Sequence, residues 1–364
     1  MNFHKELLDP DRSNQEIEKL ENNLYKRIIG QTEAIEAIVG IYKTYLAKLH
    51  NPEKPIGNLL FLGPTGTGKT RIVEVLAESV AGDVHAVLKI DCAEFQHSHE
   101  IAKLVGSPPG YLGHRETHPL ITQEKLGNGY KLSFLLFDEI EKANDALWNL
   151  LLGILDKAIL TLGDNSRVDF SQSMIFMTSN LGADKISAVL QPKMGFAALK
   201  KAPRQAASNS EQQAINRSGL EAARRKFNPE FFNRLDKVVV FRPLGKSELR
   251  QILELELDLL QQRVFRCALD VPFVFRLTES AKEHLLQEGM DMRYGARYLK
   301  RTVERNLVQP FSSLITTGQV KNGDLVQISW NSKFIFSKEA EGLTAQIMEE
   351  IGRSVPGKAA AAGI

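Results

Sequence analysis

The chain has 364 residues, about two and a half times the ~150-residue unit used to estimate domain number, so we expect two or three packed units. Charged residues make up 25% of the chain and hydrophobic residues 43%, which excludes a wholly disordered, collagen-like or coiled-coil protein. The 46 Lys and Arg residues against 44 Asp and Glu residues leave a formal charge of +2, too small to draw the molecule to nucleic acid or an anionic membrane.

Cysteine usage and the N-terminus favour a cytoplasmic protein. Cys92 and Cys267 lie far apart, so they offer neither a disulfide framework nor a metal-ligand cluster. The N-terminal residues are polar without the apolar core of a secretion signal, and no stretch approaches the ~18 apolar residues needed to span a bilayer. We therefore expect neither a membrane nor a nucleic acid as a partner.

The elements expected along the first two thirds of the chain indicate an α/β fold. Residues 1–21 form a lead-in that becomes helical near Ile17 to Leu24. Residues 22–243 form the main domain, in which short apolar runs predict strands between helical stretches: Leu59 to Leu62, Ala86 to Ile90, Phe134 to Phe137, Met174 to Met177 and Val238 to Phe241. Continuous apolar strands between helices predict a parallel five-stranded sheet covered on both faces.

The remaining sequence predicts a loop and a smaller domain. Residues 191–218 offer few side chains to bury, so we expect a mobile loop. Residues 244–337 predict a C-terminal α-rich domain: a first helix capped by Ser247, further helices over Glu279 to Gln287 and Arg297 to Leu307, and a short strand over Leu325 to Ser329. Residues 338–364 are a C-terminal tail whose last part, Pro356-Gly357-Lys358 and four alanines, is of low complexity.

A phosphate-binding motif directly follows the first predicted strand. It matches G-x-x-x-x-G-K-[ST] and comprises Gly63, Pro64, Thr65, Gly66, Thr67, Gly68, Lys69 and Thr70, with a helical run behind it. The glycines let backbone N–H groups curl around phosphates, Lys69 reaches the β- and γ-phosphate oxygens, and Thr70 offers its hydroxyl to Mg²⁺. The motif predicts an ATP/ADP site.

Two carboxylates end the strand at Phe134 to Phe137. Asp138 and Glu139 follow this apolar run directly, where burial is costly unless the charges meet a cation or a substrate. A strand ending in Asp-Glu is by itself often only a solvated strand end. Paired with the phosphate-binding motif, Asp138 suits the Mg²⁺ shell, and Glu139 suits a base that orients the attacking water.

With these residues in place, the chain resembles AAA+ ATPases of the Clp unfoldase family, in particular the second ATPase module of ClpB, ClpA and ClpC. The resemblance extends from about Glu16 to Ser337. Besides the two motifs above, it rests on five segments that occur in the family's order: residues 26–31 (KRIIGQ), 106–113 (GSPPGYLG), 177–182 (MTSNLG), 227–234 (FNPEFFNR) and 294–297 (YGAR).

The resemblance implies roles for further residues. It assigns Ile29 to the adenine pocket, Asn180 to a first sensor that holds the attacking water or the γ-phosphate, and Arg297 to a second sensor on the smaller, lid domain. Arg234 resembles the arginine finger that the family inserts into a neighbouring subunit's site, so activity is expected to need a ring, by resemblance a hexamer. Tyr111 resembles the pore-loop aromatic that grips an unfolded polypeptide, although His114-Arg115-Glu116 then departs from the family's usual aromatic and acidic residues.

The resemblance implies an ATP-driven protein unfoldase that threads polypeptide through a central pore. Three alternatives stay open. The first is an assembly or disassembly switch that does not thread substrate; the second, disfavoured by the charge of +2 and the aromatic pore loop, is a DNA-remodelling ATPase. The third is the unfoldase partner of a ClpP-type protease, suggested by Met194-Gly195-Phe196, which resembles a docking tripeptide but has Met where Ile, Leu or Val is usual.

We expect a single Clp-type module, without the N-terminal substrate domain, the first ATPase module and the coiled-coil insertion of the longer family members. The sequence is equally compatible with a fragment of such a longer chain.

Overall fold

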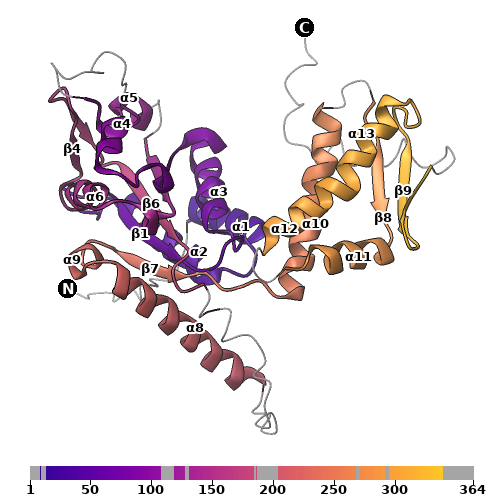
Figure 1. Ribbon diagram of the computed structural model, residues 1–364, viewed down its shortest axis with the longest axis horizontal. Helices are drawn as coiled ribbons and strands as arrows, with labels where there is room; N and C mark the ends of the chain where they lie inside the picture. Colours follow the sequence, from indigo (N-terminus) through magenta and orange to yellow (C-terminus); the bar gives the residue numbers. More distant parts are fainter. Residues whose placement is uncertain are drawn as a thin grey trace, which may run out of the picture. The chain divides into compact units, whose positions relative to one another are not determined.

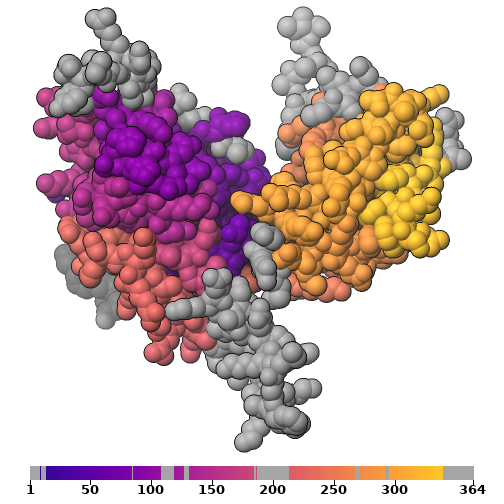
Figure 2. Space-filling model, viewed as in Figure 1, coloured from indigo at the N-terminus to yellow at the C-terminus, as the bar shows by residue number. Residues whose placement is uncertain are grey.

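The computed structural model describes residue 9 and residues 14–107, 119–127, 131–183, 186, 204–267, 271–291 and 295–338. The chain divides into two compact units, Met1–Pro243 and Leu244–Ile364. Figure 2 shows the second of these in orange to yellow. Each unit has its own buried core, so each is described by itself.

A parallel five-stranded sheet forms the centre of the first unit, in the order β2-β3-β6-β1-β7 (Figure 1). The strands are β1 (Gly57–Leu62), β2 (Val87–Asp91), β3 (Ser133–Asp138), β6 (Ser173–Ser179) and β7 (Lys237–Val240). Every residue of β1 and β6 is buried, as expected for central strands of a sheet covered on both faces. The predicted fold class and its five strands are confirmed.

Helices cover both faces of this sheet because alternate strand residues point to opposite sides. Leu59, Phe61 and Phe176 lie in one core with α1 (Gln15–Arg27), α2 (Thr32–Leu46) and α3 (Lys69–Ala81). Leu60, Leu62 and Ile175 lie in a second core with α6 (Asp145–Lys157) and α8 (Arg204–Lys226). The unit also contains α4 (Ile101–Val105), α5 (Gln123–Gly127), α9 (Pro229–Phe232), four short 3-10 helices (Val84–Ala86, Cys92–Glu94, Ser98–Glu100 and Ile140–Lys142) and the antiparallel hairpin of β4 (Ile159–Thr161) and β5 (Arg167–Asp169).

We expected a mobile loop over residues 191–218. This prediction is wrong for residues 204–218, because α8 begins at Arg204. Residues 204–226 contain no proline and are rich in Ala, Gln, Glu and Arg, which are good helix formers. The helix tolerates a polar composition because only a narrow strip of it contacts the rest of the first unit. Ile215 and Ala223 are buried, while Arg217 and Arg224 are exposed. Polarity alone therefore did not distinguish a loop from a partly packed helix.

The second unit packs helices against a three-stranded sheet of order β10-β9-β8. Its elements are α10 (Lys246–Cys267), β8 (Val274–Leu277), α11 (Glu279–Gly289), α12 (Ala296–Val303), a π-helical turn (Glu304–Val308), α13 (Gln309–Thr316), β9 (Leu325–Trp330) and β10 (Phe334–Lys338). Sequence analysis predicted only the β9 strand, because β8 and β10 are short and lack strict alternation. Ser247 is not the cap, since α10 already begins at Lys246.

Among the residues that the structure describes, no helix combines the length and the apolar composition needed to cross a membrane.

Candidate active site

The parallel sheet brings four chain segments to one edge. In the strand register, Leu62 lies beside Ser179 and Val240, and Phe137 lies beside Met177. The segments that follow β1, β3, β6 and β7 therefore emerge at the same, carboxyl edge, which is where open α/β sheets bind ligands. These segments contain the phosphate-binding motif, Asp138-Glu139, Asn180 and Arg242.

The phosphate-binding loop depends on glycine at its start. Gly63 has a φ of 135°, and a Cβ there would lie 2.5 Å from the carbonyl oxygen of Phe241, so no other residue fits. Gly66 and Gly68 also have positive φ values, of 76° and 101°. Residues 63–68 link β1 to the first turn of α3, and the N–H groups at the start of a helix suit an anion.

Lys69 lies inside this loop with only 8% of its surface exposed. Its Nζ donates to the carbonyl oxygens of Gly63, at 2.6 Å, and Pro64, at 2.8 Å. A third hydrogen bond, 3.0 Å long, goes to Asn180 Oδ1. These three hydrogen bonds hold the ammonium inside the loop, where a lysine of this motif binds phosphate oxygens.

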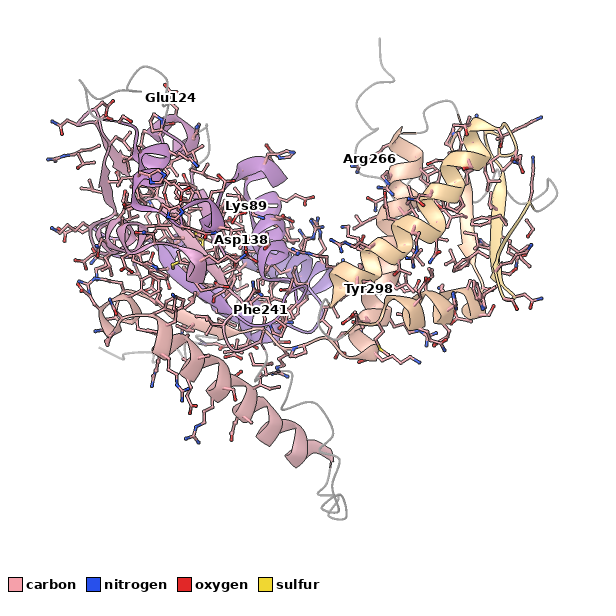
Figure 3. The ribbon with its side chains drawn as sticks, in the orientation of Figure 1. Lys89, Glu124, Asp138, Phe241, Arg266 and Tyr298 are labelled. Carbon is pink, nitrogen blue, oxygen red and sulfur yellow. The ribbon has the colours of Figure 1, made fainter. Side chains whose placement is uncertain are left out.

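Asp138 is held ionised at the end of β3. Burial by itself raises the pKa of Asp138, but hydrogen bonds from Lys89 and Thr178 and the charges of Lys89 and Lys69 outweigh it and lower the pKa. Lys89 Nζ lies 2.8 Å from Asp138 Oδ2 (Figure 3), and Thr178 donates its hydroxyl to Oδ1. Thr70 Oγ1 lies 3.5 Å from the same Oδ1, so the two predicted Mg²⁺ ligands are neighbours.

Glu139 adopts a left-handed conformation, with φ 56° and ψ 48°. This conformation costs a non-glycine residue about 1–2 kcal/mol, and such strain often marks a functional position. The backbone N–H of Glu139 donates to Thr178 Oγ1 at 3.1 Å, which stabilises the turn. Its carboxylate pairs with Lys142, and this contact raises the pKa of Lys142.

Asn180 joins the loop to the carboxylates. Its Nδ2 donates to Glu139 Oε1 at 3.0 Å, while its Oδ1 accepts from Lys69 and, at 3.4 Å, from Thr65 Oγ1. The backbone N–H of Asn180 donates to Glu141 Oε1 at 3.0 Å, which fixes the residue from a second side. The side chain therefore spans the space between the cation of the loop and the carboxylate expected to act as base.

The structure gathers some of the sequence-predicted residues and leaves others apart. The phosphate-binding loop, Asp138, Glu139 and Asn180 come together as described. Ile29 is half-buried rather than buried, because the neighbouring Ile28 fills the core. Arg297 belongs to the second unit, where it lies exposed in the first turn of α12. Tyr111 and Met194-Gly195-Phe196 lie outside the described residues.

Arg234 lies at the opposite edge of the sheet. Its carbonyl oxygen accepts from Asn58 Nδ2 at 3.1 Å, near the start of β1. Its guanidinium folds onto its own unit, where Nε lies 3.5 Å from Asp156 and Nη2 lies 3.3 Å from Glu230. The segment from Asn58 to Gly63, roughly 17 Å of extended chain, separates it from the phosphate-binding loop.

Several residues that shape the site had no predicted role, namely Lys89, Thr178, Glu141, Lys142 and Gln31. One signal was available for Lys89, a cation inside an otherwise apolar strand. Thr178 and Gln31 lie within two of the segments that carry the family resemblance, residues 177–182 and 26–31, but neither spacing nor composition indicated their contacts.

These residues fit a nucleotide and a divalent cation. The loop offers backbone N–H groups and a buried ammonium of the kind that bind phosphates. Thr70 and Asp138 offer hard oxygen donors, and the cation that contacts Asp138 here, Lys89, is half-exposed at 49% and free to move aside.

Comparisons with known proteins agree with this arrangement. The family model of the AAA domain (Cdc48 subfamily) matches residues 54–238, and the model of the C-terminal, D2-small domain of ClpB protein matches residues 244–328. Chaperone protein ClpB of Bdellovibrio bacteriovorus is 36% identical over 88% of this chain and 34% of its own length. The ATP-dependent Clp protease ATP-binding subunit ClpC of Staphylococcus saprophyticus is 37% identical over 86% of this chain and 36% of its own length. The chain thus spans about a third of these relatives.

Solved structures give the same picture. Hsp104 with ATPγS and FITC casein, in a closed state, has a TM-score of 0.74 and 27% identity over 90% of this chain and 53% of that one. The extended Hsp104–casein complex of S. cerevisiae has a TM-score of 0.76 and 26% identity over 91% of this chain and 53% of that one.

The Lys89–Asp138 contact predicts a measurable titration. In the metal-free protein, Lys89→Met should raise the pKa of Asp138, because burial is then opposed by fewer charges and hydrogen bonds. A lowered folded-state pKa stabilises the fold above the unfolded pKa of about 3.9 and loses this effect as the pH falls through the folded value. The substitution should therefore reduce stability near neutral pH and have little effect in acid. Carboxyl ¹³C NMR measures the pKa; Lys103→Met is the control, and an unchanged pKa in Lys89→Met would show that the contact is absent in solution.

Proposed function

Since the chain belongs to the AAA domain family and carries a ClpB-type D2-small domain behind its AAA domain, we propose that it hydrolyses ATP in a ring of identical subunits to thread and unfold polypeptides. The observation that carries the proposal is the hydrogen-bonded series Lys69–Asn180–Glu139 at the carboxyl edge of the sheet. An ammonium and a carboxylate contact the two ends of one amide, which supports the roles of phosphate-binding cation for Lys69 and base for Glu139.

Each residue of the site has a distinct task. The loop amides and Lys69 bind the β- and γ-phosphates, and Thr70 and Asp138 hold Mg²⁺, which when bound neutralises charge on the phosphates. Glu139 accepts a proton from the attacking water, and Asn180 orients Glu139 and the γ-phosphate. Lys142 forms an ion pair with Glu139 and so helps to hold that carboxylate in place.

Arg234 acts in trans. It lies at the edge of the sheet opposite its own loop, so it serves the site of a neighbouring subunit and not its own. A cation supplied to another subunit's site stabilises charge on the transferring phosphoryl group, an effect of about 10³–10⁵ in rate where such arginines have been studied. Asp156 and Glu230 hold the guanidinium until a neighbour is present.

The remaining roles rest on the resemblance. Ile29 contacts adenine, Arg297 contacts the γ-phosphate from the second unit, and Tyr111 grips the polypeptide. Hsp104 complexes that contain casein support a polypeptide substrate. The ring is a hexamer, and the protein acts in the cytoplasm.

The ClpC relatives favour a ClpP-type protease as a second candidate partner, since their names describe a protease subunit. A switch that remodels a partner without threading is the other alternative. Substitution of Tyr111, the expected pore residue, discriminates between a threading unfoldase and a switch.

Arg234→Ala should bind ATP nearly normally and hydrolyse it about 10³-fold more slowly or worse, because the transferring phosphoryl group loses a cation. Mixing these subunits with inactive Lys69→Ala subunits should restore part of the turnover, since the second variant lends its Arg234 to intact loops. Steady-state ATPase assays on mixed rings measure this, with Arg217→Ala, which removes an exposed arginine of α8, as the control. Assembled mixtures that regain no activity contradict action in trans.

Tyr111→Ala should abolish ATP-dependent unfolding of a tagged folded protein while ATP hydrolysis stays within about threefold of wild type, because the grip and the nucleotide site are separate. Loss of fluorescence from a tagged fluorescent protein measures unfolding, and Tyr25→Ala, on the exposed face of α1, is the control. Unchanged unfolding in Tyr111→Ala would show that another residue grips the polypeptide, and a wild-type protein that hydrolyses ATP without unfolding the tagged protein favours the switch.

A further inference from the structure

Gln31 makes an unusual set of contacts behind the phosphate-binding loop. It precedes α2 and is 4% exposed. Its Nε2 donates to the carbonyl oxygen of Thr67, at 3.2 Å, and to that of Arg242, at 3.0 Å. Its Oε1 accepts from the backbone N–H of Arg242 at 3.1 Å. One buried amide therefore joins the loop to a residue 211 positions away in the sequence.

The position of Arg242 makes this contact informative. It follows Phe241 and precedes Pro243, the last residue of the first unit. Phe241, labelled in Figure 3, donates its N–H to Leu62 at 2.7 Å and packs its carbonyl against Gly63. The chain therefore leaves the first unit beside the phosphate-binding loop. Phe241 contacts Gly63, the first residue of that loop, and Gln31 connects Arg242 to Thr67.

The two N–H donors and the oxygen acceptor of the Gln31 side chain all bind backbone groups of Thr67 or Arg242. A buried amide binds strongly where its partners are in place and is costly to leave unpaired, so a shift of Thr67 changes the position of Gln31. The N–H of Arg242 would shift with it, since Gln31 Oε1 is the acceptor that the structure gives this group. Rearrangement of the loop around a phosphate would therefore reach Arg242.

We propose that Gln31 is a positioning residue that couples nucleotide binding in the phosphate-binding loop to the backbone of Arg242, where the chain passes to the second unit. This rests on the proposed function in one respect, that the loop binds ATP. The coupling is reciprocal: if bound nucleotide shifts the opening equilibrium of the Arg242 amide by some factor, closing of that amide raises nucleotide affinity by the same factor.

Hydrogen exchange on the full chain tests the proposal, with ATPγS and Mg²⁺ as the probe and overlapping peptides that resolve the amide of Arg242. In wild type, saturating ATPγS should slow exchange both at residues 63–70 and at Arg242, the latter by about tenfold, within the usual range of coupling factors. Gln31→Met keeps the side-chain length and removes all three hydrogen bonds. It should keep protection at residues 63–70, lose the response at Arg242 and bind ATPγS about tenfold more weakly.

Two further variants separate coupling from simple loss of structure. Gln31→Glu keeps the acceptor for Arg242 N–H and loses the N–H donors to the carbonyl oxygens of Thr67 and Arg242, so the Arg242 amide should stay protected and become insensitive to nucleotide. Gln261→Met is the matched control: Gln261 forms the same kind of clamp in the second unit, with Phe273 O at 2.8 Å and Phe275 N at 3.0 Å. In Gln261→Met, ATPγS should slow hydrogen exchange at Arg242 as much as it does in wild type.

Three results would overturn the proposal. One is a wild-type protein in which ATPγS protects residues 63–70 but not Arg242. Another is a nucleotide response at Arg242 that survives in Gln31→Met or Gln31→Glu. If ATPγS leaves even residues 63–70 of wild type unprotected, the proposed function fails first and the coupling fails with it.

Discussion

The amide of Asn180 lies between an ammonium and a carboxylate, and the chemistry of the site depends on that position. Lys69 donates to its oxygen and Glu139 accepts from its nitrogen, so one planar group sets the separation of the two charges. Without it, an ammonium and a carboxylate in a half-buried space would attract each other directly. Lys69 would then be drawn away from the carbonyl oxygens of Gly63 and Pro64 that position it in the loop.

The parallel sheet supports this arrangement. β1 and β6 are buried along their whole length, so the segments that follow them have little freedom. Thr178 contributes twice at the end of β6, since its hydroxyl donates to Asp138 and accepts the N–H of Glu139. Glu141 fixes the backbone of Asn180 in turn. Strain at Glu139 is therefore maintained by a rigid strand and not by a flexible loop.

Residues whose role follows from the local sequence were predicted well. Four of the five strands follow from continuous apolar runs, and β2 follows from a run that only Lys89 interrupts. The phosphate-binding motif defines its own geometry, because only glycine tolerates the close approach of Phe241 to Gly63. Residues whose role depends on distant partners were missed. Lys89 has its role from a carboxylate on the next strand, and Gln31 from a carbonyl 211 residues away.

The polar helix α8 shows the opposite error. Its composition suggests solvent on all sides, yet two small patches of apolar contact are enough to hold it against the sheet. Hydrophobic pattern detects a broad buried face and overlooks a narrow one. The same limit hid the edge strands of the second unit, where β10 is largely exposed.

The central claim is that this edge of the sheet binds ATP with one set of residues and activates water with another. The most direct test measures ATP binding and phosphate release side by side for wild type and Glu139→Gln. The account predicts near-normal ATP affinity and hydrolysis slower by about 10²–10⁴-fold, because Lys69, Thr70 and Asp138 are untouched while the base is lost. Wild-type turnover in Glu139→Gln would contradict it.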